Sequence, residues 1–295
     1  MIRRRLIIIS ILVMVVSCTH QPKNQSPLEL PSAINARSKV TELNKTDLIE
    51  QIMMKSGMTE MIEQLPGVAA MGFDQQSPPP INQREYEKFR GIYLQAFNSS
   101  MIRETITNYL NDHYEAKRFT ELLAMLRTPL AEKMTELEVQ SSSVESQQQM
   151  MQSANTIMGQ VSPERLALIR QLDQVQQATQ SMLAMQMTMT QAMMVNANKI
   201  VPEKQQLSEK NMAELLDDIR KQSLFPAQQY IQLNMVYAYR AATDAELENY
   251  ITLYKSKVGR WSIELLNEAW VNVSEAISTK LATLMTQNFV RQNAL

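Results

Sequence analysis

Apolar residues recur three or four positions apart through most of the chain beyond residue 42, which puts them on one face of an α-helix. Leu48, Ile49 and Ile52 begin this pattern. Gly57 follows the first apolar turns and indicates a helix end, since glycine is common just past a helix C-terminus. The spacing predicts helices over residues 43–56, 58–73, 84–113, 122–126, 162–201, 207–222, 226–239, 243–254 and 256–289.

Capping residues and prolines sharpen the predicted helix boundaries. Thr128–Pro129 and Ser162–Pro163 each place a hydroxyl before a proline, which tolerates the first helical position because its missing N–H is not needed there. Thr243–Glu246 has the spacing of a capping box. Ser77–Pro80 is a predicted break, and Ser141–Gln152 is predicted to be a connection or an exposed helix.

Composition agrees with a helical fold. The 295 residues include only 6 glycines, while the helix formers Leu, Met, Gln, Ala and Glu are plentiful. Turns between strands favour glycine, so we predict an all-α protein. The net charge is −1 and no basic patch stands out, so we do not expect the chain to bind nucleic acid.

The first 17 residues have the pattern of a secretory signal peptide. Arg3–Arg5 form a positive segment, and Leu6–Val16 is an apolar run of the length found in cleaved signals. A membrane-spanning helix needs about 20 apolar residues. The run is therefore too short to remain as a transmembrane anchor.

Val15–Cys18 resembles the lipobox of bacterial lipoproteins. The resemblance implies cleavage before Cys18 and lipidation of that cysteine by acyl chains such as palmitate, which would anchor the protein in a membrane. Cys18 is the only cysteine, and a lone thiol is unusual in an exported protein unless it is consumed. The alternative is an ordinary signal peptide with a chance cysteine, cut elsewhere. Thr19 replaces the aspartate of the enterobacterial inner-membrane signal, which favours the outer membrane, facing the periplasm.

Two related helical bundles are predicted beyond the anchor. The expected organisation is a signal peptide at 1–17, the lipidated cysteine and a disordered tether at 18–40, a first bundle at 41–140, a connection at 141–160 and a second bundle at 161–295. After a shift of 128 positions, Leu122, Leu126, Thr128, Leu130 and Ala131 fall on Tyr250, Tyr254, Ser256, Val258 and Gly259. In both copies a hydroxyl caps a new helix, and a small residue three positions on allows close helix crossing. This pattern predicts an internal duplication.

The second copy resembles a bacterial family known as domain of unknown function 2059. The resemblance rests on the Glu246–Leu247 pair and on Leu253–Arg260, which has an aromatic residue, a serine and a glycine at helix-break spacing. Lys257 replaces the family's usual proline. Members are typically exported and all-helical, with no established activity. The resemblance therefore implies a fold and a compartment, and transfers no functional residues.

Methionine is the most unusual component, with 22 residues. Met182, Met185, Met189 and Met193 form one stripe of a predicted helix. Thioether sulfur suits the soft ion Cu(I), so the stripe is one candidate metal or ligand site. The alternative, which we favour, is that flexible methionines fill an irregular core or form an adaptable contact surface.

Aromatic residues gather in the second half and include Tyr250, Tyr254 and Trp261. They could line a groove for a peptide, a lipid or a partner helix. Packing in the core of a bundle is the interpretation that we favour. Of the two histidines, His113 follows a predicted helix, where a position at its C-terminus explains it better than metal binding or acid–base chemistry.

No catalytic signature is present in the sequence. We find no glycine-rich phosphate loop, no nucleophile elbow and no His-Glu-x-x-His motif. The sequence therefore predicts a non-enzymatic envelope lipoprotein that takes part in a protein interaction or in envelope assembly. We expect no cofactor apart from the covalent lipid. The alternative function is a periplasmic binding protein for a hydrophobic ligand or Cu(I), using the methionine-rich helix.

Overall fold

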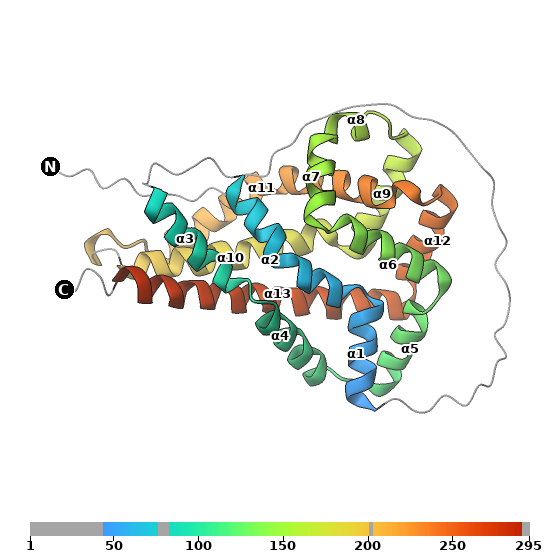
Figure 1. Ribbon diagram of the computed structural model, residues 1–295, viewed down its shortest axis with the longest axis horizontal. Helices are drawn as coiled ribbons and strands as arrows, with labels where there is room; N and C mark the ends of the chain where they lie inside the picture. The colour runs from blue at the N-terminus through green and yellow to red at the C-terminus, as the bar shows by residue number, and fades with distance from the viewer. Residues whose placement is uncertain (1–43, 76–82, 201–202, 291–295) are drawn as a thin grey trace.

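The computed structural model describes residues 44–75, 83–200 and 203–290, and within these ranges it contains helices and no strand (Figure 1). The predicted all-α class is confirmed. The predicted signal peptide, Cys18, the tether and the Ser77–Pro80 break lie outside the described residues.

The first half of the chain contains eight α-helices, all within the described ranges. They are α1 (Lys45–Lys55), α2 (Met58–Asp74), α3 (Gln83–Ala96), α4 (Ser99–Asp112), α5 (Ala116–Leu126), α6 (Pro129–Ser141), α7 (Val144–Gln152) and α8 (Ala154–Met158). The Ser- and Gln-rich stretch predicted as a connection or an exposed helix is mostly helical, in α7.

The second half contains fewer but longer helices. They are α9 (Pro163–Gln176), α10 (Ala178–Ile200), α11 (Glu209–Ala238), α12 (Asp244–Lys255) and α13 (Lys257–Met285), with the short elements η1 (Glu203–Gln205), η2 (Tyr239–Ala241) and η3 (Thr286–Val290). In Figure 1, α13 runs along the long axis of the molecule, with α10 beside it.

The predicted caps are confirmed. The side chains of Thr128 and Ser162 each accept a hydrogen bond from the backbone N–H three positions on, at the start of α6 and α9. Thr243 and Glu246 form a complete capping box at the start of α12. Each cap satisfies a backbone donor that has no partner within its helix.

Three predicted boundaries were wrong. The helix predicted over 84–113 divides into α3 and α4, because Asn98 leaves the helical conformation and caps α4. The helix predicted over 162–201 divides at Gln177, whose φ of 55° lies in the left-handed region. The helices predicted on either side of Pro226 are instead one helix, α11. A proline removes one helical hydrogen bond and bends the helix, but packing of the flanking turns can keep it continuous.

Two main hydrophobic clusters form the core, and each takes a helix from the other half of the sequence. The first contains side chains of α1 to α5 together with Leu265, Val273 and Ile277 of α13. The second joins α9, α11 and α12 to Met134 of α6. The predicted boundary at 141–160 therefore does not separate the two cores, because α6 and α13 cross it in opposite directions.

The two halves use corresponding helix pairs. Helix α1 packs on α5, and α9 packs on α12, which are the equivalent helices of the predicted repeat. At the break between α12 and α13, Gly259 is buried against the backbone of Leu253 and Tyr254. This is the close approach that the small residue was predicted to allow. The internal duplication itself stays a prediction.

Candidate functional site

The methionine stripe lies on α10, which packs between α13 on one side and α11 on the other. Met182, Met185, Met189 and Met193 are all half-buried, and Met189 packs against the first core cluster. The stripe is therefore part of the contact between helices and also retains exposed surface.

The N-terminal part of α11 stands apart from the cores. Residues 209–225, which we call the α11 arm, contribute no side chain to any of the three hydrophobic clusters of the described chain. After Pro226 the same helix becomes buried, with Leu233 and Tyr237 each 5% exposed. The proline thus marks the point where α11 changes from a peripheral helix to a core helix.

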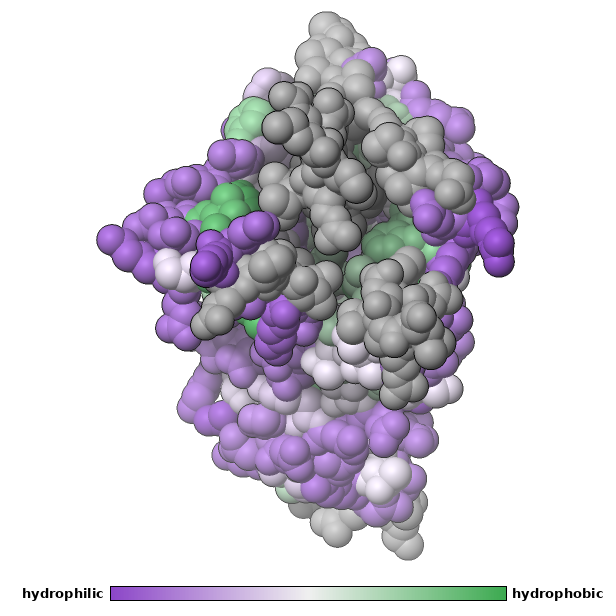
Figure 2. Space-filling view, turned by 90° about the vertical axis from the view of Figure 1, so that its left-hand side faces the viewer, coloured by the Kyte–Doolittle hydropathy of each residue, from purple (hydrophilic) through white to green (hydrophobic). Residues whose placement is uncertain are grey.

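Large apolar side chains are exposed on and beside the arm. They are Leu207 (43% exposed), Leu215 (42%), Leu224 (38%) and Phe225 (64%). Figure 2 faces the end of the molecule that holds the turn between α10 and α11, and shows hydrophobic residues among the hydrophilic ones there. Leu224 and Phe225 are neighbours near the end of the arm, whereas Leu215 lies two and a half turns earlier on the opposite side of α11 from Leu224. The segment thus exposes apolar side chains on more than one of its faces.

Few polar contacts join the arm to the rest of the molecule. Gln186 Nε2 donates to Ser223 Oγ at 3.5 Å, which is a long hydrogen bond. At the turn, Asn198 bonds both backbone groups of Leu207, at 2.8 and 2.9 Å. The ion pairs of the arm, such as Lys221–Asp217 at 2.5 Å, lie within the arm itself. Helix α11 packs along α10, and the Gln186–Ser223 bond joins the arm to that helix.

The structure does not bring the predicted aromatic residues to this surface. Tyr250 is only 1% exposed and lies in the second core, which agrees with the favoured interpretation of core packing and removes it from contact with a partner. Tyr254 is half-buried beside it, with the two hydroxyl oxygens 3.2 Å apart. Trp261 packs in the first core, with its ring centroid 5.7 Å from that of Phe119 and beneath the guanidinium of Arg118.

Sequence reasoning missed a polar cluster around Glu138. Oε1 of Glu138 accepts hydrogen bonds from the hydroxyls of Tyr239 at 2.5 Å and of Tyr250 at 2.9 Å. One signal could have revealed it: Glu138 occupies the apolar stripe of α6, seven positions after Ala131 and four after Met134, both buried. A carboxylate on such a stripe must be paired or protonated.

Burial and hydrogen bonding oppose each other in this cluster. Burial raises the pKa of Glu138, and it outweighs the hydrogen bonds from Tyr239, Tyr250 and Gln176, which lower it. Burial and the charge of Glu138 hold the pKa values of Tyr239 and Tyr250 well above that of a free tyrosine. All three tyrosine hydroxyls, including that of Tyr254, therefore stay protonated at neutral pH.

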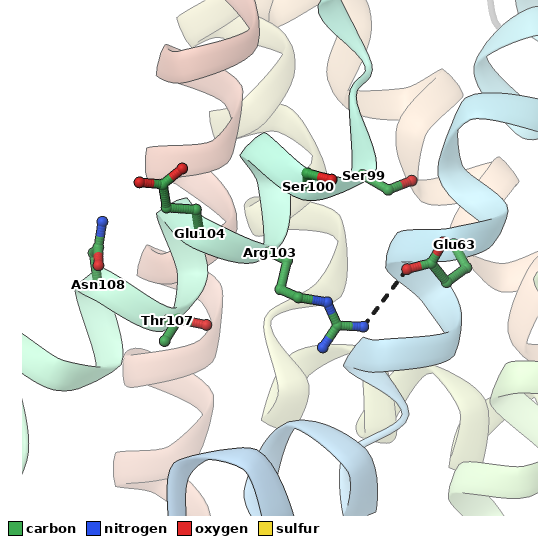
Figure 3. Close-up of a pocket in the computed structure, with 7 residues that line it drawn as sticks. All are labelled: Glu63, Ser99, Ser100, Arg103, Glu104, Thr107 and Asn108. Carbon is green, nitrogen blue, oxygen red and sulfur yellow. Dashed lines mark ion pairs between the residues drawn. The ribbon is translucent and has the colours of Figure 1, made fainter. Parts of the chain in front are cut away.

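A surface hollow of about 360 Å³ lies between α2 and α4 (Figure 3). It is lined by Glu63, Ser99, Ser100, Arg103, Glu104, Thr107 and Asn108. Arg103 Nη2 reaches towards Glu63, with 3.6 Å between the paired atoms, whereas Glu104 and Asn108 point away from this pair in Figure 3. The hydroxyls of Ser99 and Thr107 already donate to Ile62 O and Met53 Sδ. Arg103 and Glu63 thus form an ion pair within the lining of the hollow.

In the described part of the chain, no three His, Cys, Asp or Glu side chains converge as they would around a metal ion. His113 ends α4, as predicted, where its Nδ1 lies 2.9 Å from the carbonyl oxygen of Tyr109 and its ring stacks on Tyr109 at 4.0 Å.

None of the helices in the described ranges combines the length and apolar character that crossing a membrane requires. Comparison of the chain with protein-family models, with curated proteins and with solved structures found no match.

Proposed function

We propose that this protein is a lipid-anchored, non-enzymatic component of the bacterial envelope that binds a protein partner through the α11 arm. The lipobox-like Val15–Cys18 segment supports the anchor and the compartment. A single acyl chain holds a protein on a membrane only weakly, so stable attachment at Cys18 needs more than one chain. The outer membrane, facing the periplasm, is the proposed location because Thr19 follows the cysteine.

One observation carries the proposed binding role. Five large hydrophobic side chains are exposed in the described residues, and four of them lie between residues 207 and 225. Burying these side chains against a partner would contribute about 25 cal/mol for each Å² of apolar surface removed from water. The flexible methionines of α10 beneath the arm could adapt to that partner.

Site-specific photocrosslinking in intact cells tests this role. A photoreactive residue at Leu215 or Phe225 should capture the same envelope protein, identified by mass spectrometry. The matched control is Glu121, which is exposed on α5, far from the arm in sequence, and should capture none. Phe225→Glu should abolish capture from position 215 without changing the thermal unfolding midpoint, because Phe225 is largely exposed. Equal capture from all three positions, or capture from position 121 alone, would contradict the proposal.

A second candidate function rests on the thioethers beneath the arm. Met182, Met185, Met189 and Met193 follow one another along α10 and remain half-buried, which would suit a hydrophobic ligand or Cu(I). Native mass spectrometry and metal analysis of protein purified from cells distinguish the two functions. A bound molecule or copper that is lost in a Met185→Leu, Met189→Leu variant would favour this candidate over the protein partner.

A further inference from the structure

The side chain of Glu138 joins the two halves of the chain. Helix α6 belongs to the first half in sequence but packs in the second core. The carboxylate oxygen Oε1 accepts from Tyr239 of η2 and from Tyr250 of α12, and the side-chain amide of Gln176, at the end of α9, lies near enough to influence the pKa of Glu138. One carboxyl group thereby bonds two elements of the other half.

The carboxyl group of Glu138 lies among aromatic rings. The residue as a whole is half-buried, and burial is the largest influence on the pKa of its carboxyl. The ring of Tyr250 packs edge-on against Tyr239 at 6.2 Å and against Tyr254 at 4.9 Å, so aromatic rings surround the hydroxyl groups. A carboxylate in such a place is costly unless a cation neutralises it or it takes up a proton.

No cation pairs with Glu138 in the described part of the chain. The nearby ion pairs use other carboxylates: Lys133 of α6 binds Glu246 of α12 at 2.6 Å, and Arg165 of α9 binds Asp244. The titratable groups that face Glu138 are the hydroxyls of Tyr239, Tyr250 and Tyr254. Helix α9 adds only the neutral amide of Gln176. Helices α5, α7 and α11 also pack on α6, and none of their charged side chains is among the groups acting on Glu138.

We propose that Glu138 makes the contact of α6 with the second core sensitive to pH. Protonation of its carboxyl stabilises this contact, and ionisation destabilises it. The cluster accommodates both states. The ionised carboxylate accepts from the two tyrosine hydroxyls. The protonated carboxyl gains a donor, and the hydroxyl oxygen of a neighbouring tyrosine, Tyr239 or Tyr250, is an acceptor within reach.

The direction of the pH effect follows from the dominance of burial. Since burial raises the pKa of Glu138 in the folded protein, the folded state binds the proton more tightly than the unfolded state does. The stabilisation is fully present below the pKa of an unfolded glutamate and is lost as the pH rises through the folded pKa. Lowering the pH over this range therefore stabilises the contact of α6 with the second core.

Urea unfolding of the full-length chain in detergent across this pH range tests the proposal. The wild-type protein and Glu138→Gln are compared with Glu136→Gln, a matched control that removes an exposed carboxylate from the same helix. We expect Glu138→Gln to abolish the part of the pH dependence of the unfolding free energy that arises from the uptake of one proton, whereas Glu136→Gln keeps it. A pH dependence that is equal in all three proteins would overturn the proposal.

Two further measurements keep the test decisive if Glu138→Gln does not fold. In the wild-type protein, carbon NMR should show one glutamate carboxyl that titrates above the exposed ones, and Tyr250→Phe should shift it further upward by removing a donor to the carboxylate. Hydrogen exchange, corrected for the intrinsic effect of pH, should show α6 losing protection relative to α4 as that carboxyl ionises. A carboxyl that titrates with the exposed ones, or α6 protection that does not follow it, would show that Glu138 has only a structural role.

Discussion

Replacing Gly259 by alanine should strongly destabilise the fold, because the junction between α12 and α13 leaves no room for a Cβ atom. An added Cβ would lie 2.5 Å from the carbonyl oxygen of Leu253, 2.6 Å from Cα of Tyr254 and 2.8 Å from its carbonyl oxygen. All three are backbone atoms and cannot rotate away. The chain must therefore separate the two helices or move the N-cap at Ser256, whose Oγ accepts from Gly259 N at 3.0 Å.

The magnitude follows from two costs and one gain. Forcing an extra methyl group into a packed site costs about 1–3 kcal/mol. Losing an N-cap hydrogen bond costs about 1 kcal/mol. The higher helix propensity of alanine returns about 0.5–1 kcal/mol. We therefore expect Gly259→Ala to lower the free energy of unfolding by about 1–3.5 kcal/mol.

The matched control is Gly91→Ala in the interior of α3, where an added Cβ meets nothing within 4 Å. There only propensity acts, so the free energy of unfolding should rise by about 0.5–1 kcal/mol. Urea unfolding followed by circular dichroism measures both variants, with an unchanged denaturant slope as the check that the same structure unfolds. A loss of under 1 kcal/mol for Gly259→Ala, or an equal loss in the control, would refute the steric reasoning.

Gly57→Ala should lower the free energy of unfolding by about 1–2 kcal/mol in the same assay, because Gly57 has a φ of 74° and an added Cβ would lie 2.7 Å from Val139 Cγ2. Burial raises the pKa of Tyr93 to about 12 from 10.0, so the folded state loses stability as pH rises between these values, and urea unfolding in this window should show a smaller loss for Tyr93→Phe. Cys18→Ser should move the protein from the membrane fraction to the soluble fraction of disrupted cells and abolish labelling by a fatty-acid analogue.

Each of these three predictions has an outcome that would contradict it. An unchanged unfolding midpoint for Gly57→Ala would mean that α1 and α2 can meet without the left-handed residue. Parallel stability losses at alkaline pH in the wild type and in Tyr93→Phe would assign the loss to other tyrosines. A Cys18→Ser protein that stays in the membrane fraction and takes up the label would remove the lipid anchor from the proposed function.

Local features of this protein were readable from the sequence because their causes lie within a few residues. A capping hydroxyl at Thr128 or Ser162 and the capping box at Thr243 act on N–H groups two or three positions away. The apolar spacing of each helix and the scarcity of glycine act in the same way, so the all-α class followed from them. The capped break at Ser256–Gly259 was likewise visible as a short-range pattern.

Only the tertiary structure decided which apolar faces meet. The stripe of α6 that contains Met134 would suit either bundle, and its place in the second core depends on contacts with Tyr239 and Tyr250, more than 100 positions away. The same contacts create the environment of Glu138. The sequence predicted a break between two helices before Pro226, yet packing of the turns after this proline keeps α11 continuous. Helical periodicity defines a face, whereas the partner of that face is chosen by the packing of the whole chain.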